Sequence, residues 1–145
     1  MDRLDKESIA RLIFFENMII NADWSVPIVH NIKIISLSPF YPPIPIPYDF
    51  DWAGIIDIPY STHLYTAEDG QTPIWRFKGA CLDRQTQKHT IDLFNDKREA
   101  IYSLYKNFEL LDKSQLERIL KSYDNFYNMI NSPVKLYKKL KFICK

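Results

Sequence analysis

Glycine and cysteine are both scarce in this sequence, which has three of the former and two of the latter among 145 residues. A loop that wraps phosphates through its main-chain N–H groups needs several glycines close together, so no glycine-rich loop is expected. Cys81 and Cys144 are too few and too far apart for a zinc site or a disulfide framework. We expect both to be reduced thiols.

Long apolar runs and an export signal are missing as well. No apolar stretch approaches the roughly 20 residues that a membrane-spanning helix requires. The sequence begins Met1-Asp2-Arg3-Leu4, without the basic and then apolar order of a signal peptide. Together with the reduced cysteines, these absences predict a cytoplasmic protein that has no membrane partner.

An excess of either charge is also lacking, because 19 basic residues face 18 acidic ones and the formal net charge is +1. A field that would draw the protein to nucleic acid is therefore not expected. Apolar residues are abundant instead, at 46% of the chain with 14% aromatic, which is typical of a folded protein. The length suits a single domain over residues 1–145.

The first half of the chain predicts a buried helix followed by a hairpin. Residues 7–20 are apolar on most sides, as in a central helix, and Asp5 or Ser8 can cap its start. Residues 31–37 are β-branched and partly alternating, which indicates a strand. Residues 44–50 have prolines at alternate positions, so this second strand can pair through one side only. We expect the two strands to form an antiparallel hairpin.

The second half predicts helices after a long excursion. Residues 55–90 combine turn signals with aromatic anchors (Tyr65, Trp75, Phe77) and are expected to be only partly ordered. A helical period begins at residue 91, and we expect residues 91–145 to form a helical subdomain packed against the first helix. Its two apolar stripes comprise Ile91, Phe94, Ile101, Leu104, Tyr105 and Phe108, and then Leu116, Ile119, Leu120, Tyr123, Phe126, Tyr127 and Ile130.

Two further signals mark helix starts in this half. Asp112 or Ser114 can cap the second helix, and Ser132-Pro133 begins a third. The fold class expected from both halves is α+β and mostly helical.

Residues with metal-binding and proton-accepting side chains surround the predicted hairpin. Phosphoryl transfer needs a carboxylate to orient or deprotonate the attacking hydroxyl, and hard oxygen ligands to hold Mg²⁺ against the phosphates. Asp23 can supply the first, and Asn31 with Asp49 the second. A hairpin between Asn31 and Asp49 would bring its two ends together, although they are 18 positions apart.

The order helix, Asp and Asn loop, hairpin and Asp-Phe motif resembles the C-terminal lobe of the protein-kinase-like superfamily. The resemblance covers residues 7–54 and is closest to atypical members: CotH-type and HipA-type kinases, aminoglycoside phosphotransferases and certain Bacteroides-like bacterial proteins. The segments that carry it are Asn21-Ala22-Asp23-Trp24-Ser25, His30-Asn31-Ile32-Lys33 and Pro47-Tyr48-Asp49-Phe50-Asp51-Trp52-Ala53-Gly54.

The resemblance implies roles for individual residues of the region 1–54. Asp23 is similar to the catalytic-loop Asp, Asn31 to the metal-binding Asn and Asp49 to the metal-binding Asp of the DFG element. Asp51 is either a second metal ligand or the true counterpart of that Asp. The implied cofactors are Mg²⁺ (or Mn²⁺) and ATP.

Two cations of this lobe could contribute to nucleotide binding. They are Lys33 and Arg76, although Lys33 does not stand where the phosphate-binding lysine of the family lies.

The sequence departs from the family pattern in its spacing and its extent. Seven residues separate Asp23 from Asn31, where protein kinases have four. The lobe that carries the glycine-rich loop and the strand lysine is expected to be absent. The chain would then be a fragment or a truncated product, or another polypeptide would supply that lobe.

Three functions stay open at this point. The first is an incomplete ATP- and Mg-dependent phosphotransferase, and the second is a catalytically silent kinase-like remnant that serves as a binding or scaffold module. The third is a metal-dependent hydrolase that uses Asp23, Asp49 and Asp51. Residues of the region also have purely structural interpretations, since Asn21 can cap a loop, His30 can be a hydrogen-bonding residue and Trp24 a core anchor.

Overall fold

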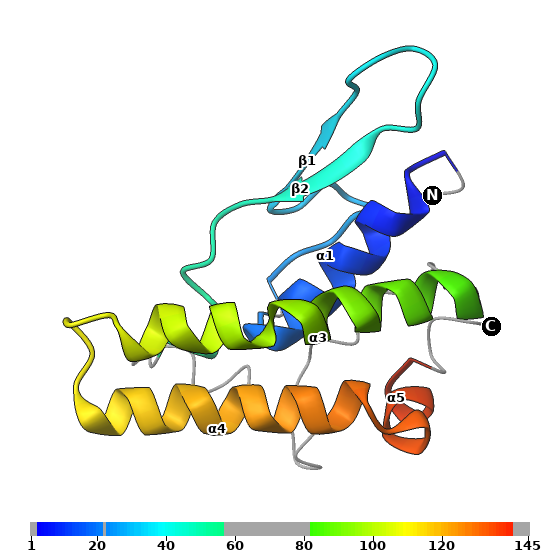
Figure 1. Cartoon of the computed structure of the whole chain (residues 1–145). Helices are drawn as coiled ribbons and strands as arrows, with labels where there is room; N and C mark the ends of the chain where they lie inside the picture. Colours follow the sequence, from blue (N-terminus) through cyan, green and yellow to red (C-terminus); the bar gives the residue numbers. More distant parts are fainter. Residues whose placement is uncertain (1–2, 22, 57–81, 141–145) are drawn as a thin grey trace.

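A two-stranded hairpin, a central helix and a pair of longer helices are stacked in that order (Figure 1). The computed structural model describes residues 3–21, 23–56 and 82–140. The elements are α1 (Lys6–Met18), β1 (Ile32–Ile35), β2 (Ile44–Pro47), α3 (Arg84–Lys106), α4 (Lys113–Ile130) and α5 (Pro133–Leu140). The predicted α+β, mostly helical class is confirmed. Tyr65, Trp75, Arg76, Phe77 and both cysteines lie outside the described residues.

Helix α1 is the buried central helix that its apolar sequence predicts. Asp5 rather than Ser8 is its N-cap, because the Asp5 carboxylate accepts a hydrogen bond of 2.8 Å from the Ser8 N–H. The helix packs against β2 on one side and against α3 and α4 on the other. Its buried residues are Ile9, Ala10, Leu12, Ile13, Phe14, Glu16 and Met18. Six of these seven are apolar, and Glu16 is the exception.

The C-terminal end of α1 has an unusual residue in a common motif. The Asn21 N–H donates to the Glu16 carbonyl at 2.8 Å, and the Ile20 N–H donates to the Asn17 carbonyl at 3.2 Å. This pair of bonds is the Schellman ending, in which the residue after the cap takes a left-handed conformation. That residue is normally glycine, but here it is Ile20 with φ 58°. The β-branched side chain makes this conformation costly, by roughly 1–2 kcal/mol.

The hairpin has the antiparallel pairing that the sequence predicts, in shorter strands. Its register joins Ile32 to Pro47 and Ile35 to Ile44. The Tyr48 N–H continues the ladder to the Asn31 carbonyl at 3.0 Å. In this register Pro45 and Pro47 direct their ring nitrogens away from β1, because alternate residues of a strand bond to opposite sides. The two ends of the hairpin are thereby held together at Asn31 and Tyr48.

Helix α3 begins earlier than the sequence predicts, at Arg84, so the expectation of irregular structure up to residue 90 is wrong. Asp83 caps it and accepts a hydrogen bond of 2.8 Å from the Thr86 N–H. The inward positions of this first part are Thr86 and Thr90, which are buried and lie about two turns and one turn ahead of Phe94. Threonine at these positions conceals the helical period from an apolar pattern.

Helices α3 and α4 are joined by aromatic packing and polar bonds. The Phe94 ring lies 5.7 Å from that of Phe14 and 5.6 Å from that of Phe126, measured between centroids. The Tyr127 hydroxyl donates to the Phe94 carbonyl at 3.0 Å. Phe94 therefore connects all three helices of the core. None of the helices in the described segments is long and apolar enough to cross a membrane.

The remaining helix starts follow the sequence. Asp112, not Ser114, caps α4, and with Gln115 it forms a reciprocal capping box. Helix α5 begins at Pro133 as expected. The helical part thus covers residues 84–140 of the described chain, and it packs against α1 as predicted.

Two members of the first predicted stripe do not reach the core. Leu104 is 67% exposed and Phe108 is also exposed. Leu104 lies on the wall of an open apolar groove of about 850 Å³ between α1, α3 and the segment 50–56. The stripe is wider than the surface that α1 and α4 cover, so its edge faces this groove.

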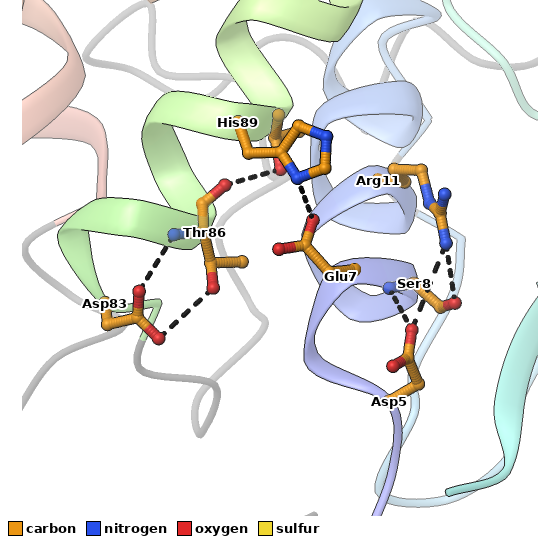
Figure 2. A network of polar contacts seen from close by, with 8 residues as sticks. Asp5, Glu7, Ser8, Arg11, Asp83, Thr86 and His89 are labelled. Atoms are coloured by element: carbon orange, nitrogen blue, oxygen red, sulfur yellow. Dashed lines mark hydrogen bonds and ion pairs between the residues drawn. The ribbon is translucent and has the colours of Figure 1, made fainter. Parts of the chain in front are cut away.

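Polar side chains form contacts near the N-terminal ends of α1 and α3, and the Glu7–His89 pair links the two helices (Figure 2). His89 Nδ1 lies 3.2 Å from a carboxylate oxygen of Glu7. The Thr86 hydroxyl also donates to the Asp83 carboxylate at 3.1 Å. The Glu7–His89 pair is largely exposed, so it aligns the two helices without adding much stability.

Truncation of Phe94 tests the packing of the three helices. We expect Phe94→Ala to lower the free energy of unfolding by about 3–5 kcal/mol, because it leaves a cavity between buried rings. Leu104→Ala on the same helix is the matched control and should cost less than about 1 kcal/mol. Urea unfolding followed by circular dichroism measures both, and equal losses would contradict the placement of α3.

Candidate functional site

The loop after α1 returns on itself and brings distant residues together. Ser25 and His30 form an antiparallel bridge through two main-chain hydrogen bonds of 2.9 Å each. Residues 26–29 make the turn between them. Asn31 and β1 follow directly, so the loop that contains Asp23 is folded against the start of the hairpin.

Asp23 is held by the two residues at the end of this loop. His30 Nε2 lies 2.9 Å from Asp23 Oδ1. The Asn31 side-chain N–H donates to Asp23 Oδ2 at 3.0 Å and to the Asp23 carbonyl at 2.8 Å. The predicted catalytic Asp23 and the predicted metal ligand Asn31 are therefore in direct contact. Because Asn31 uses its amide nitrogen here, its amide oxygen is the atom that it can offer to a cation.

The segment after β2 is anchored on the end of α1. The Gly54 N–H donates to the Ile20 carbonyl at 3.0 Å, and the Ile55 N–H donates to the Ile19 carbonyl at 3.2 Å. The Phe50 ring packs edge-on against Phe15, with centroids 5.6 Å apart. The same helix end thus precedes the Asp23 loop and receives the segment that carries Asp49 and Asp51.

Asp51 is close enough to Asp49 and Asp23 to be influenced by their charges. The pKa of Asp51 is raised, first by desolvation, then by a hydrogen bond with Asp49, and also by the negative charges of Asp49 and Asp23. Like charges that raise a pKa in this way favour a proton or a cation between them. The structure therefore places Asp23, Asp49 and Asp51 in one electrostatic cluster.

The cluster is not a complete metal cage. No group of three or more His, Cys, Asp or Glu side chains within residues 3–21, 23–56 and 82–140 is arranged to hold a metal ion. That criterion leaves out the amide oxygen of Asn31. Mg²⁺ in phosphate-transferring sites commonly has one or two carboxylates and completes its shell with phosphate oxygens and water. Asn31, Asp49 and Asp51 are residue types of this smaller ligand set, and their joint binding of a cation stays a prediction.

The backbone takes left-handed conformations at several residues around the candidate site. Four residues other than glycine have positive φ, and they are Ile20 (58°), Val29 (53°), Asn31 (52°) and Asp49 (61°). Asn and Asp tolerate this conformation, whereas Ile and Val do so at a cost. All four lie in the loops that shape the cluster. Strained residues concentrate at functional sites, where the surrounding structure compensates for them.

Lys33, the predicted nucleotide-binding cation, lies in β1 and is exposed. Its Nζ is 5.3 Å from the centroid of the Tyr48 ring, a cation–π arrangement. Tyr48 immediately precedes Asp49, so Lys33 is near that end of the hairpin. Its role in nucleotide binding stays a prediction.

Sequence reasoning missed a buried polar pair beneath the loop. Glu16 and Asn21 are both 0% exposed. Burial raises the pKa of Glu16 to about 7, and the side chain of Asn21 partly opposes this shift. The Asn21 Oδ1 accepts a hydrogen bond of 3.0 Å from the Asp23 N–H. Glu16 was hidden because it stands in an apolar helix, where one acidic residue ordinarily faces solvent.

The structural interpretations of the loop residues are confirmed, whereas their functional interpretations stay predictions. Asn21 does cap the loop, as its bond to the Asp23 N–H shows. Trp24 is a buried core residue, and its indole N–H donates to the Asn21 carbonyl at 3.2 Å. His30 was expected to be a hydrogen-bonding residue, but its partner Asp23 could not be read from the sequence. The adjacency of His30 to Asn31 was the available signal.

The chain matches no protein-family model, no curated protein and no solved structure.

Replacing Val29 tests the strain in the loop. Val29→Asn should raise the free energy of unfolding by about 1 kcal/mol, because asparagine tolerates positive φ and Val29 is 51% exposed. The matched control is Ile28→Asn, at a neighbour that is 75% exposed. It should change stability by less than about 0.5 kcal/mol. Thermal unfolding of both variants gives the comparison, and a destabilised Val29→Asn would argue against the strained turn.

Proposed function

We propose that this chain is the metal-binding lobe of an ATP- and Mg²⁺-dependent phosphotransferase of the protein-kinase-like type. One observation carries the proposal: Asp23 is held by His30 and Asn31 while Asp49 and Asp51 share its electrostatic cluster. Asp23 and Asn31 precede β1, and Asp49 and Asp51 follow β2. The Tyr48–Asn31 hydrogen bond joins these two ends of the hairpin. An acceptor-orienting carboxylate beside oxygen ligands is what phosphoryl transfer requires.

Each residue has a distinct part in the proposed reaction. Asp23 orients the acceptor hydroxyl and takes up its proton, with His30 and Asn31 fixing both of its carboxylate oxygens. Asn31, through its amide oxygen, and Asp49 hold the divalent cation, and Asp51 is the further ligand or the alternative to Asp49. A bound Mg²⁺ neutralises charge on the phosphates and helps to align them.

A bound nucleotide must be contacted from a second side, which the proposed residues Asp23, Asn31, Asp49 and Asp51 do not supply. The hairpin exposes large apolar side chains, at Ile34, Ile35, Leu37, Phe40 and Tyr41. Large apolar side chains exposed on one element favour contact with another part of a complex. A separate nucleotide-binding lobe or partner protein is the occupant that the proposal requires.

The same exposed hairpin also favours a second candidate function. A catalytically silent module would use these exposed apolar side chains of the hairpin to bind a partner, and it would need neither ATP nor a metal ion. The two candidates differ in what Asp23 and Asp49 do, so they can be separated by substitution.

Divalent cations should stabilise the protein through the cluster. We expect Mg²⁺ or Mn²⁺ to raise Tm, since a ligand at 100 times its Kd adds about 2.7 kcal/mol to the stability of the native state. Asp49→Asn should remove most of this shift, whereas Asp96→Asn on α3 should keep it. Differential scanning fluorimetry with and without the cation makes the measurement. Loss in Asp51→Asn alone would transfer the main ligand role to Asp51, and an unchanged shift in both variants would remove the cation from the proposal.

Turnover should require both the second lobe and Asp23. The chain alone should bind ATP weakly and transfer phosphate negligibly, because it contacts the phosphates from one side only. Addition of the separate lobe, or use of a longer chain that contains it, should give turnover that Asp23→Asn reduces by about 10²–10⁴-fold. Calorimetry with ATP and a phosphate-release assay test this. Absence of ATP binding by the completed protein would favour the silent binding module.

A further inference from the structure

Glu16 and Asn21 form a buried polar pair whose hydrogen bonds are incomplete. Both carboxylate oxygens of Glu16 and the side-chain nitrogen of Asn21 are buried without a well-formed hydrogen bond in the described part of the chain. Asn21 is nevertheless near enough to affect the protonation of Glu16. Buried polar atoms in this condition are costly, and they are rare in native proteins.

Asn21 also connects α1 to the Asp23 loop through three other atoms. Its main-chain N–H donates to the Glu16 carbonyl at 2.8 Å, and its carbonyl accepts the Trp24 indole N–H at 3.2 Å. Its Oδ1 accepts the Asp23 N–H at 3.0 Å. The orientation of the Asn21 amide therefore determines where the Asp23 main chain sits.

The surroundings of Glu16 do not offset a negative charge. Burial and the Asn21 side chain are the two causes that set the protonation of Glu16, and no charged group of the described residues is a further cause. His89 of α3 pairs with Glu7.

We propose that Glu16 is a positioning residue for Asp23, and that the proton on its carboxyl decides how the Asn21 amide holds the Asp23 loop. An ionised carboxyl attracts the Asn21 side-chain N–H₂ group, as the lowering effect of Asn21 on the Glu16 pKa indicates, and so holds the amide with Oδ1 on the Asp23 N–H. A protonated carboxyl accepts this group more weakly and leaves the Asn21 amide, and with it the Asp23 loop, less firmly oriented. The functional meaning of this switch rests on the proposed role of Asp23, but the switch itself does not.

The direction of the pH dependence follows from the burial of the carboxyl. The pKa of Glu16 is raised from 4.5 to about 7, so the folded protein binds this proton more tightly than the unfolded chain. The stabilisation is fully present below pH 4.5 and is lost as the pH rises through about 7. The loop should change over the same interval.

Nuclear magnetic resonance between pH 5 and pH 9 tests the proposal without ATP or metal. The probes are the Glu16 side-chain carboxyl carbon, the Asp23 amide and the Trp24 indole N–H. His30 contacts Asp23, so the series is recorded in wild type and in a His30→Gln background. We expect all three probes to shift together with a midpoint near pH 7. In Glu16→Gln the Asp23 and Trp24 signals should stay constant, whereas Glu7→Gln on the same helix should leave their titration unchanged.

Each other outcome overturns the proposal. Glu16 could titrate near its ordinary value, the Asp23 and Trp24 signals could ignore its titration, or their shifts could persist in Glu16→Gln. If Glu16→Gln does not fold, the wild-type and His30→Gln series still decide. Loss of the phosphotransferase role leaves this measurement unaffected, because no catalytic activity enters it.

Discussion

The burial of α1 on two sides is the constraint on which the rest of the structure depends. Apolar side chains around most of its circumference require cover from β2 as well as from α3 and α4. A helix fixed in this way has an immobile C-terminal end, and the carbonyls of Ile19 and Ile20 there receive the segment at Gly54 and Ile55. The candidate site thus forms where two connections leave or return to a single helix end. The hydrophobic effect is non-directional, but the burial of α1 fixes the helix end to which the segments carrying the three aspartates are attached.

Local patterns predicted the elements whose signals were strong. A buried helix and a hairpin were predicted correctly because continuous apolar residues and alternating prolines each admit few structures, although α1 ends at Met18 and not at residue 20 and both strands are shorter than predicted. The start of α3 was missed because Thr86 and Thr90 occupy its inward positions, and threonine has no helical signature. Leu104 was placed in the core because a periodic stripe shows which residues share a face but not how far the neighbouring helices extend. That limit depends on contacts between segments, which the sequence does not encode locally.

The candidate site was likewise predicted in part. Asp23, Asn31, Asp49 and Asp51 were selected from their order along the chain, and the structure brings Asn31 into contact with Asp23 and the aspartates into one electrostatic cluster. The bond from His30 to Asp23 was beyond prediction, because it depends on the Ser25–His30 bridge that closes the turn. The left-handed conformations of Asn31 and Asp49 were equally hidden, since residue type permits such conformations without requiring them.

Pro45 and Pro47 have a consequence for how this hairpin meets other polypeptides. A free strand edge is a template for pairing with any extended chain, including a misfolded second copy of the same protein. The missing donors of the two prolines, together with the packing of α1 against β2, close one edge to such pairing. Growth of the sheet is left to the β1 side alone. The hairpin is thereby protected on one flank from edge-to-edge aggregation, and an incoming strand has a single direction of approach.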